Sequence, residues 1–364
     1  MALAFDISGA PTASETAPPL PWRIAALSAP DASLAREWDA LADLGVGSPY
    51  QGRGWVSRFL DTAGKAEGQE PAIVTIRDGG GRLLGLFPLA VRSALGARVA
   101  GFVGDKHANY HLPLLTPEFA ASLDAERTRL LLRDIAAALG GIDAFHFINQ
   151  PADWAGQPHP LAAVASWPAA QQAHALELSP DAASALERSL SKHARKTLRS
   201  KRRKLDEIGA SRMVRAGTEA ELDWLCEAFL RQKAARFREM GIADPFAAHG
   251  VMEMLKSAAL PAPDGAPPSV EWHGLALGDR VIAVFIGAVD RLRYAGMATS
   301  FEYEDDAIAR TSPGELLLAD LILDQGARGR SMFDLGVGDA RYKTTFCDQT
   351  EALVETILPF TLRG

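Results

Sequence analysis

Residues 310–343 read RTSPGELLLADLILDQGARGRSMFDLGVGDARYK, and the order of patterns in this stretch decides the fold. Helical, leucine-rich periodicity covers 315–329, the strand-like run SMFDLG follows it, and a short helix-like segment begins at DARYK. The stretch therefore predicts a helix, a strand and a second helix in that order.

The loop before the predicted helix has the chemistry of a phosphate site. Ser312 is expected at the N-cap and Pro313 at the first helical position, while Gly314 lets a ligand approach the backbone. Free N–H groups at such a helix start can hold a pyrophosphate. The tripeptide alone is also ordinary capping chemistry, so its function depends on its surroundings. The predicted cofactor-binding residues are Arg310, Thr311, Ser312, Pro313 and Gly314.

Two antiparallel meanders are predicted, one in each half of the chain. In each, three runs rich in Val, Ile, Leu and Phe are separated by short turn sequences such as Gly278-Asp279. A helix and a strand follow each meander, and the strand after the first one reads AFHFIN. The runs are 72–77, 83–91 and 97–104 in the first half, and 270–277, 281–289 and 292–299 in the second.

The repeated order extends to the residues themselves. Residues 130–147 align by eye with 316–333, which places Gly140, a predicted C-cap glycine, opposite Gly326. The repeat period, about 186 residues, is too long for the unit of a solenoid and indicates two related domains. A chance match of two leucine-rich helices is the alternative.

The predicted fold class is α/β (α+β), with two tandem domains that are each a mixed, mainly antiparallel sheet flanked by helices. Residues 1–20 lack the basic and apolar regions of a signal peptide and are expected to form a flexible tail. A linker rich in Pro, Ala and Gly lies between Pro151 and Pro168. The predicted domains are therefore 21–165 and 166–364.

The composition of the 364 residues is that of a globular protein, with 48% hydrophobic and 23% charged residues. The net charge of -7 argues against coating of nucleic acid through overall charge. The two cysteines, Cys226 and Cys347, form no metal or disulfide motif, so no metal site is expected and a reducing cytoplasm is favoured. The longest apolar runs are too short to cross a membrane.

One segment is strongly basic: 188–204 holds nine Lys or Arg residues. As a helix it would bury Leu190 and Leu198 and present Arg195 and Arg199 on the opposite face. A solvated face with long aliphatic stems is the plain interpretation. A functional face would bind phosphates of CoA, a diphosphate-linked sugar or a polyanionic glycan through charge-assisted hydrogen bonds. RNA is less favoured because aromatic residues are not interleaved.

Residues 186–346 resemble the acetyltransferase domain of the CelD/BcsL family, a GNAT branch related to the FemAB peptidyltransferases. The first half resembles the same family more loosely, and FemAB-like proteins also carry two GNAT-like domains. The first copy has no Ser-Pro-Gly loop, so we expect it to shape the acceptor pocket rather than bind CoA. The residues that carry the resemblance are the run RRKLDEIG, Gly278-Asp279-Arg280, Tyr294, Ser312-Pro313-Gly314, FDLG at 333–336, Gly338, Tyr342-Lys343, and, in the first half, Ser48-Pro49-Tyr50, Trp55 and Asn109-Tyr110-His111.

The resemblance implies direct transfer of an acyl group from acetyl-CoA or another acyl-CoA to an acceptor amine, with no covalent enzyme intermediate. Asp334 is the first choice for the base that accepts the amine proton, and an ion pair with Lys343 or Arg341 is its structural alternative. Tyr342 would protonate the leaving thiolate, or else be a core residue. Lys343 would neutralise phosphate or orient Asp334.

The acceptor implied by the family is a small-molecule or lipid-linked sugar, or an anionic glycan, in bacterial exopolysaccharide synthesis. Transfer to nitrogen and transfer to oxygen both remain open. The residues predicted to bind the acceptor or its phosphates are Trp55, Asn109, Tyr110, His111, Arg195, Arg199 and Tyr294.

Two other functions stay open. One is FemAB-like transfer from aminoacyl-tRNA, in which the basic segment would meet RNA. The other is a non-catalytic GNAT-like protein that binds a glycan or nucleotide. The sequence contains no GxSxG, Walker A, HExxH or Rossmann motif, so hydrolase, NTPase, zinc-protease and dehydrogenase functions lack support.

Overall fold

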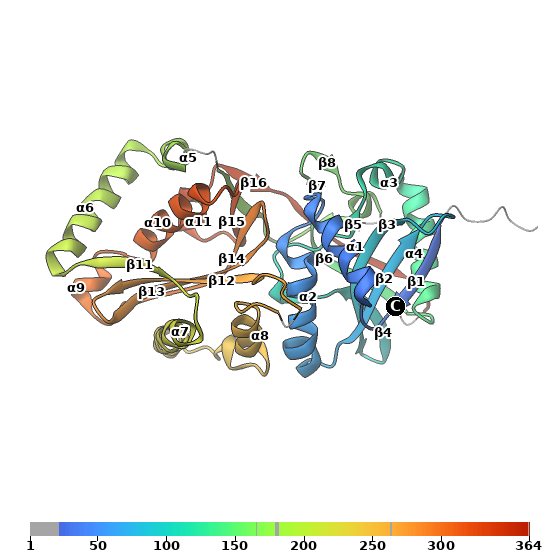
Figure 1. The fold of residues 1–364 in the computed structure, drawn as a ribbon, viewed down its shortest axis with the longest axis horizontal. Coiled ribbons are helices and arrows are strands. Elements are labelled where there is room, and N and C mark those ends of the chain that lie inside the picture. The colour runs from blue at the N-terminus through green and yellow to red at the C-terminus, as the bar shows by residue number, and fades with distance from the viewer. Residues whose placement is uncertain (1–21, 165, 179–181, 263, 363) are drawn as a thin grey trace, which may run out of the picture.

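The computed structural model describes residues 22–164, 166–178, 182–262, 264–362 and 364, and it contains two large β-sheets side by side (Figure 1). Each sheet combines an antiparallel meander with one parallel strand pair, and helices flank both sheets. This confirms the predicted class of two mixed, mainly antiparallel sheets with helices. The expected tail, 1–20, lies outside the described residues.

The first sheet has the strand order β1-β2-β3-β4-β6-β17-β9, with β5 paired to β3. The predicted meander is its centre, and β6 runs parallel to β4 after the crossover helix α4 (Ala125–Ala138). The strands are β1 (Arg23–Leu27), β2 (Glu70–Arg77), β3 (Leu83–Ala94), β4 (Ala97–Phe102), β5 (Leu114–Leu115), β6 (Ala144–Pro151), β9 (Ser166–Pro168) and β17 (Leu353–Pro359).

Shorter elements complete this half of the chain. They are α1 (Ala32–Asp43), η1 (Pro49–Gln51), α2 (Arg53–Phe59), the π-helical turn η2 (Leu60–Gly64), η3 (Asp105–His107), α3 (Pro117–Ala121), the hairpin β7 (Asp153–Trp154) and β8 (Gln157–Pro158), and η4 (Pro160–Ala163). As predicted, Gly140 follows α4 in the left-handed conformation, with φ of 73°.

The second sheet has the order β11-β12-β13-β14-β15-β10-β16, and its predicted meander is also confirmed. The strands are β10 (Ala173–Glu177), β11 (Ser211–Arg215), β12 (Val270–Leu277), β13 (Arg280–Val289), β14 (Arg293–Phe301), β15 (Met332–Val337) and β16 (Gln349–Glu351). The helices are α5 (Ala182–Ser189), α6 (Lys192–Ile208), α7 (Glu219–Met240), η5 (Pro245–Ala247), α8 (Val251–Ser257), α9 (Asp306–Ala309), α10 (Pro313–Ala327) and α11 (Arg341–Phe346).

The helices of the second domain divide between the two faces of its sheet. In Figure 1, α5, α6, α10 and α11 lie on one face, and α7 and α8 lie on the other. Helix α10 is buried along most of its length because Leu317, Leu318 and Leu321 pack against this sheet. The predicted correspondence of Gly140 with Gly326 is wrong. Gly326 lies inside α10, and the left-handed residue after the helix is Gly329, with φ of 84°, which is therefore the counterpart of Gly140.

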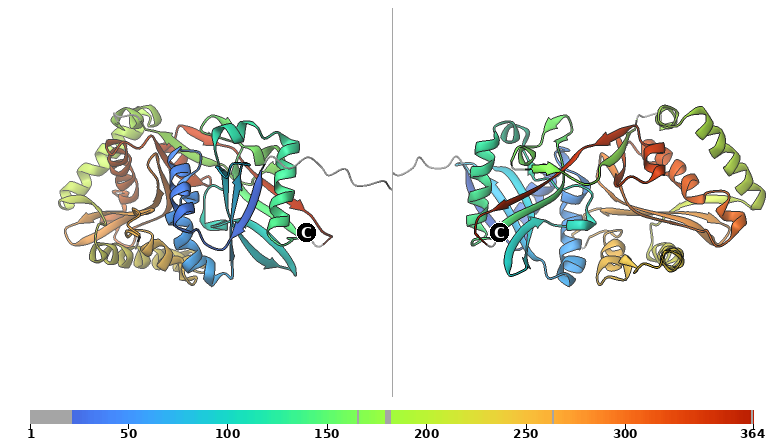
Figure 2. Two further views of the ribbon diagram at one scale, coloured as in Figure 1. Left: turned by 45° about the vertical axis from the view of Figure 1, so that its right-hand side comes forward. Right: turned by 180° about the vertical axis from the view of Figure 1, so that it is seen from behind.

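The last strand crosses from one domain to the other. After β16 completes the second sheet, β17 pairs antiparallel with β6 and with β9 of the first sheet, and Figure 2 shows it running across that half of the molecule. The expected second domain, 166–364, therefore differs from the sheets at both ends. Both β9 and β17 belong to the first sheet. The sequence did not predict this, because strand pairing between distant segments leaves no local sequence pattern.

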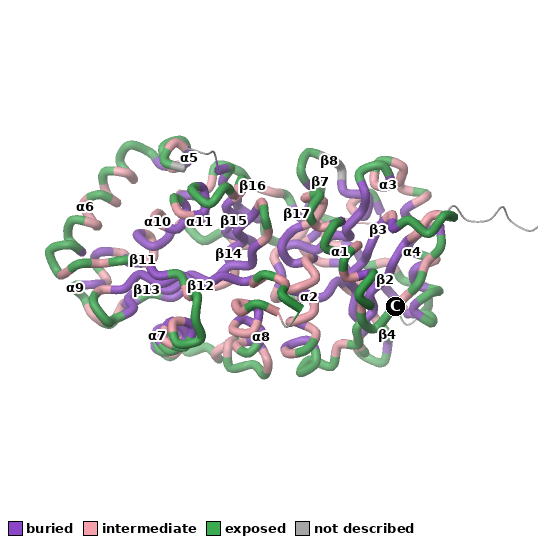
Figure 3. Tube along the Cα trace, in the orientation of Figure 1, coloured by how far each residue is buried: buried purple, intermediate pink, exposed green. Residues whose placement is uncertain are grey.

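The basic segment forms two helices rather than the single helix expected. Ser191 breaks it, because its side-chain oxygen accepts a hydrogen bond from the Ala194 N–H and caps α6. Arg188 consequently lies on α5, apart from the basic residues of α6. Most positions along α6 are exposed or half-buried, as Figure 3 shows.

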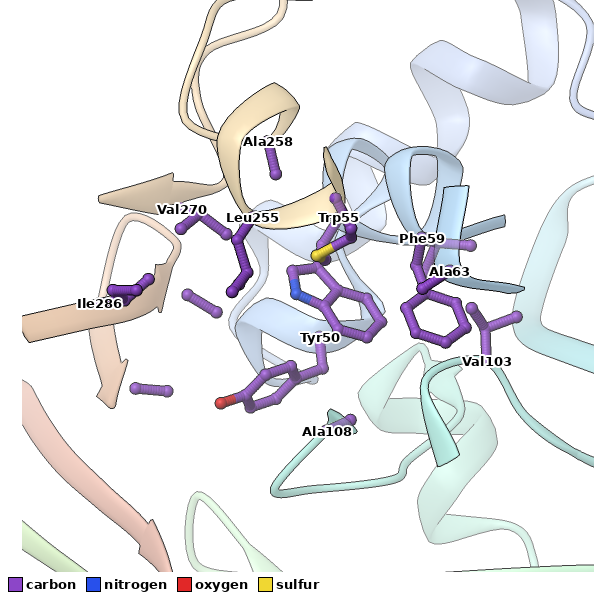
Figure 4. Close-up of a cluster of buried hydrophobic side chains, with 14 of the residues drawn as sticks. Tyr50, Trp55, Phe59, Ala63, Val103, Ala108, Leu255, Ala258, Val270 and Ile286 are labelled. Atoms are coloured by element: carbon purple, nitrogen blue, oxygen red, sulfur yellow. The ribbon is translucent and has the colours of Figure 1, made fainter. Parts of the chain in front are cut away.

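The two domains share one buried hydrophobic cluster. Trp38, Trp55 and Phe59 of the first domain belong to the same cluster as Phe229 and Trp272 of the second. Figure 4 shows the part of this cluster in which α2 approaches α8 and β13. The domains are thus packed against each other by a continuous core.

Candidate functional site

The N-terminus of α10 has an unusual backbone. Ser312 occupies the predicted N-cap position, but its φ of 50° and ψ of 63° are left-handed and its side chain makes no capping hydrogen bond. Because Pro313 has no N–H, Gly314 supplies the first amide of the helix, and the described residues include no acceptor for it. A left-handed non-glycine residue at this point is a strained feature of the kind that collects at functional sites.

A pocket of about 230 Å³ lies under this helix start. It brings together three of the predicted residues, Ser312, Gly314 and Tyr342. Its other walls come from β13, β14, the segment that follows β14, and α9 and α10, so a ligand there would lie against both backbone N–H groups and apolar side chains. They are Phe285, Thr299, Phe301, Glu302, Ala309, Glu315 and Leu318. We call this cavity the donor pocket.

Two carboxylates line the donor pocket, and each is paired with a cation. Glu302 accepts a hydrogen bond from Arg280 at 2.7 Å, and Glu315 accepts one from Lys201 of α6 at 2.6 Å. Burial raises the pKa of Glu302, but Arg280 outweighs it and leaves that pKa below the ordinary value. Because both charges are compensated, the pocket wall does not exclude an anionic ligand.

A polar groove of about 340 Å³ continues from the donor pocket and shares Glu315 and Tyr342 with it. It lies between α6 and α11, and its basic lining comes from His193, Lys201 and Arg341. Its lining from α6 includes Lys201 and His193 but neither Arg195 nor Arg199, the two residues predicted to bind phosphate, and from the start of α10 it includes Glu315.

The rest of the basic face is divided. Arg202 is paired with Asp320 of α10 at 2.5 Å, and Arg195 is 3.2 Å from Glu187. Five other cations of α6 are exposed and have no ion-pair partner among the described residues. They are Lys192, Lys196, Arg199, Arg203 and Lys204.

Three predicted loop residues lie outside the donor pocket lining. Arg310 is 80% exposed and has only a loose contact, 3.9 Å, with Asp306. Thr311 is buried and donates a hydrogen bond to Ile308 O at 2.6 Å, and Pro313 is buried as the first helical residue. Thr311 and Pro313 therefore shape the loop, while Arg310 is free to reach a bound anion.

The parallel strands β14 and β15 part next to this site. They are paired only from Arg293/Met332 to Ala295/Asp334, and a β-bulge leaves Met297 as the extra residue of β14 just beyond. We call the divergence of these two strands the split. Among the described residues, the edge of β14 past Gly296 consequently has no partner strand on that side.

Asn109, which comes from the first domain, bridges the split. Its Nδ2 donates to Gly296 O at 2.9 Å and to Tyr50 Oη at 2.7 Å, and its Oδ1 accepts from Val337 N at 3.4 Å. One side chain thus replaces the sheet hydrogen bonds that β14 and β15 no longer make to each other. The sequence predicted that Asn109 binds the acceptor. It did not indicate that Asn109 connects β14 and β15 at the split.

Asp334, the first choice for the catalytic base, is fully buried and already engaged. Its Oδ2 accepts from Arg293 at 2.6 Å and its Oδ1 accepts from Gly336 N. Arg293 in turn lies 4.1 Å from the centre of the Trp154 ring. The geometry favours the structural alternative for Asp334, with Arg293 rather than Lys343 or Arg341 as its partner.

The other two predicted catalytic residues occupy different positions in α11. Tyr342 is half-buried and lines both the donor pocket and the groove, and burial raises the pKa of its phenol, which keeps it protonated. Lys343 is buried, burial lowers the pKa of its ammonium, and its Nζ donates to Val337 O at 2.6 Å. Tyr342 faces the cavity, whereas Lys343 fixes the strand beside the split.

Four residues expected to contact the acceptor form interior packing instead. Trp55 stacks on Phe59 with ring centres 5.2 Å apart, and Tyr294 stacks on Phe333 at 5.1 Å. Tyr110 and His111 are equally buried. Large aromatic residues near a motif can belong to the core or to a site. Here Trp55 and Tyr110 belong to the cluster shared by the two domains, Tyr294 to the core of the second domain, and His111 stacks on Phe102 of the first.

In the first domain, the space between the parallel strands β4 and β6, which corresponds to the split, is filled by side chains. Phe102 packs on His111 and Phe147 between β4 and β6, and the cavity there measures only about 20 Å³. Asp124 caps the N-terminus of α4, where its carboxylate accepts a hydrogen bond from Arg127 N and would repel a phosphate.

Among residues 22–164, 166–178, 182–262 and 264–362, no helix combines the length and hydropathy that crossing a bilayer requires. Within the same described part of the chain, no group of three or more His, Cys, Asp or Glu side chains is arranged to hold a metal ion.

Comparison with known proteins supports this picture. Residues 192–344 match the model of the acetyltransferase (GNAT) domain family. Among curated proteins, no sequence matches significantly.

Solved structures show the similarity of the whole fold. FemX has a TM-score of 0.62 at 11% identity, covering 89% of this chain and 96% of that one. A conserved protein of unknown function from Bacteroides thetaiotaomicron has a TM-score of 0.55 at 10% identity, with 92% and 100% covered. L-PGS from Bacillus licheniformis has a TM-score of 0.51 at 9% identity, with 92% and 95% covered. The predicted tandem GNAT-like fold is thereby confirmed.

Proposed function

We propose that this protein is a GNAT-type acyltransferase that moves an acyl group, acetyl in the simplest case, from acyl-CoA to an amino or hydroxyl group. The observation that carries the proposal is the donor pocket, in which the free N–H of Gly314, the αL residue Ser312 and the phenol of Tyr342 line one cavity beside the split. A helix N-terminus with an unpartnered amide suits a pyrophosphate. The basic groove that opens from it suits further phosphate.

In the proposed reaction, the acceptor nitrogen or oxygen attacks the thioester carbonyl while both substrates are bound. The new bond to the acyl carbon forms, the carbon–sulfur bond breaks, and Tyr342 gives its proton to the departing thiolate. The proton of the acceptor passes to water, from which Tyr342 recovers its own. Asp334 and Lys343 hold β15 in place, because their polar atoms are bound to Arg293, Gly336 and Val337.

Calorimetric titration with acetyl-CoA tests the donor half of the proposal. Wild type should bind, and Gly314→Glu should weaken binding by about tenfold or more, because a carboxylate at this helix start opposes the pyrophosphate. A side chain at Gly314 would approach Phe301 at 3.1 Å, and Phe301 is exposed enough to move. Gly79→Glu is the matched control, since it adds the same charge in an open turn. Wild type that does not bind acetyl-CoA removes the proposal.

A second candidate function is transfer from an aminoacyl-tRNA, and the exposed, unpaired Lys196, Arg199, Arg203 and Lys204 favour it. RNA binding through these residues would weaken steeply with salt. Competition between total tRNA and acetyl-CoA, measured at two salt concentrations, separates the two donors. The sugar acceptor and the exopolysaccharide context come from the family resemblance alone, so glucosamine is included among the acceptors tested below.

A further inference from the structure

A second cavity, of about 490 Å³, opens between the domains on the other side of β14. The first domain contributes residues of α2, η2 and η3 to it, and the second contributes η5, α8 and β14. The lining consists of Phe59, Ala63, Lys106, His107, Asn109, Pro245, Phe246, Ala248, Val251, Met254, Leu255, Met297 and Ala298. We call it the junction cavity.

The lining of the junction cavity is mainly apolar. Its two basic side chains, Lys106 and His107, both contact Glu67, at 3.2 and 3.0 Å. No acidic side chain is among the described residues that line it. Asn109 is the remaining polar group, and it is half-buried at the split.

The linings of the junction cavity and the donor pocket adjoin along β14. Met297 and Ala298 line the junction cavity, and Thr299, two residues beyond Met297, lines the donor pocket. Asn109 lines the junction cavity and at the same time holds Gly296 and Val337 at the split. A molecule in the junction cavity could therefore present an atom to a thioester held at the split.

We propose that the junction cavity receives the acceptor, and that the acceptor carries its amine or hydroxyl on an apolar aliphatic or aromatic body. This inference rests on the proposed acyltransferase function. The volume lies in the usual range of ligand sites at domain interfaces, which are largely apolar with a few polar groups. A free sugar would leave most of its hydroxyl groups without partners against this lining.

Another interdomain cavity, of about 640 Å³, has charged side chains in its lining, namely Asp153, Asp290, Arg293 and Glu351, and we call it the polar cavity. It opens at the beginning of β14, before the strands part, and the Tyr110 and Trp154 rings lie between the domains there, 5.1 Å apart. It provides the comparison for the test, because it would suit a polar acceptor.

The test measures thiol release from acetyl-CoA with hexylamine, 2-phenylethylamine or glucosamine, and measures acetyl-CoA binding separately by calorimetry. Hexylamine and 2-phenylethylamine should exceed glucosamine in kcat/KM by about tenfold or more. Ala298→Phe fills the junction cavity and Met297→Gln makes it more polar at a half-buried position. Each should lower kcat/KM for the apolar amines by about tenfold while changing the acetyl-CoA Kd by no more than about twofold.

Asp153→Ala, in the polar cavity, is the control and should leave transfer unchanged. Use of glucosamine as efficient as that of hexylamine overturns the inference, as does a loss of transfer in Asp153→Ala that Ala298→Phe and Met297→Gln do not share. If acetyl-CoA binds but none of the three amines releases thiol, the acceptor class is wrong while the donor half stands. If wild type does not bind acetyl-CoA, the proposed function fails and the inference fails with it.

Discussion

Gly336 leaves the space that Asn109 occupies: a Cβ atom on Gly336 would lie 2.3 Å from Asn109 Nδ2. Gly336 also has a φ of 70°, a conformation that side chains disfavour. A residue of the second domain thus stays small so that a residue of the first domain can join two diverging strands.

Gly336→Ala should lower the free energy of unfolding by about 2 to 4 kcal/mol, through backbone strain and the displacement of Asn109. Gly278→Ala is the matched control, because Gly278 also has a positive φ, 59°, but open space around it. Denaturant unfolding of both variants measures the difference. Equal decreases in the free energy of unfolding for the two variants would show that Asn109 can move away from the new methyl group without destabilising the protein.

Asn109→Ala should reduce thiol release by about tenfold to a hundredfold in kcat, because the two sides of the split lose their common anchor. The Kd of acetyl-CoA should change little, since the donor pocket lies on the α10 side. Arg291→Ala is the control, because it removes an exposed interdomain hydrogen bond, to Asp43 O, away from the split. An unchanged kcat accompanied by lower stability would assign Asn109 a packing role only.

Tyr342→Phe should lower kcat by about a hundredfold if the phenol protonates the thiolate, while the donor still binds. Tyr303→Phe, at a half-buried tyrosine outside the donor pocket lining, is the comparison. Steady-state thiol release and calorimetry on the same preparations give both quantities. Activity retained in Tyr342→Phe would show that water protonates the sulfur.

Asp334→Asn should lower the free energy of unfolding by about 3 to 5 kcal/mol, because the buried Arg293 loses its nearest carboxylate, at 2.6 Å, and keeps only Glu351 at 3.6 Å. Asp320→Asn, which breaks the more exposed pair with Arg202, should cost less. Chemical unfolding gives the free energies. A stable Asp334→Asn protein without activity would restore Asp334 as the base.

Acid should destabilise the protein through its buried histidines. Burial lowers the pKa of His159 from 6.5 to about 3, so in this range the unfolded chain binds a proton that the folded protein does not. Stability is therefore full above about pH 6.5 and decreases as the pH falls toward 3. His159→Leu should flatten this dependence in unfolding measured across that range. His249→Leu, at an exposed histidine, should leave the slope unchanged.

Much of the fold could be predicted because it depends on local patterns. The alternating runs of both meanders and the Ser-Pro-Gly start of α10 each report on adjacent residues, and they identified the strands and the donor loop. The break at Ser191 was missed because the leucine spacing continues through it, although a serine three residues before Ala194 is itself a capping signal.

The rest depends on contacts between distant segments. Nothing in the sequence around Asn109 indicates that it reaches Gly296, and nothing around Trp55 indicates that α8 covers it. The resemblance brought Asn109, Tyr110 and His111 forward together, yet only Asn109 lines a cavity large enough for a ligand. The pairing of Asp334 with Arg293 needed the parallel register of β14 and β15.

The crossing of β17 has a consequence for biosynthesis. Strand β9 leaves the ribosome long before β17, yet its neighbour in the first sheet is β17, which separates it from β6. A nascent chain usually folds from its N-terminal domain onward. Here the edge of the first sheet beside β6 stays unpaired until β17 has been translated, after the entire second domain. The half of the protein that is made first is therefore completed last.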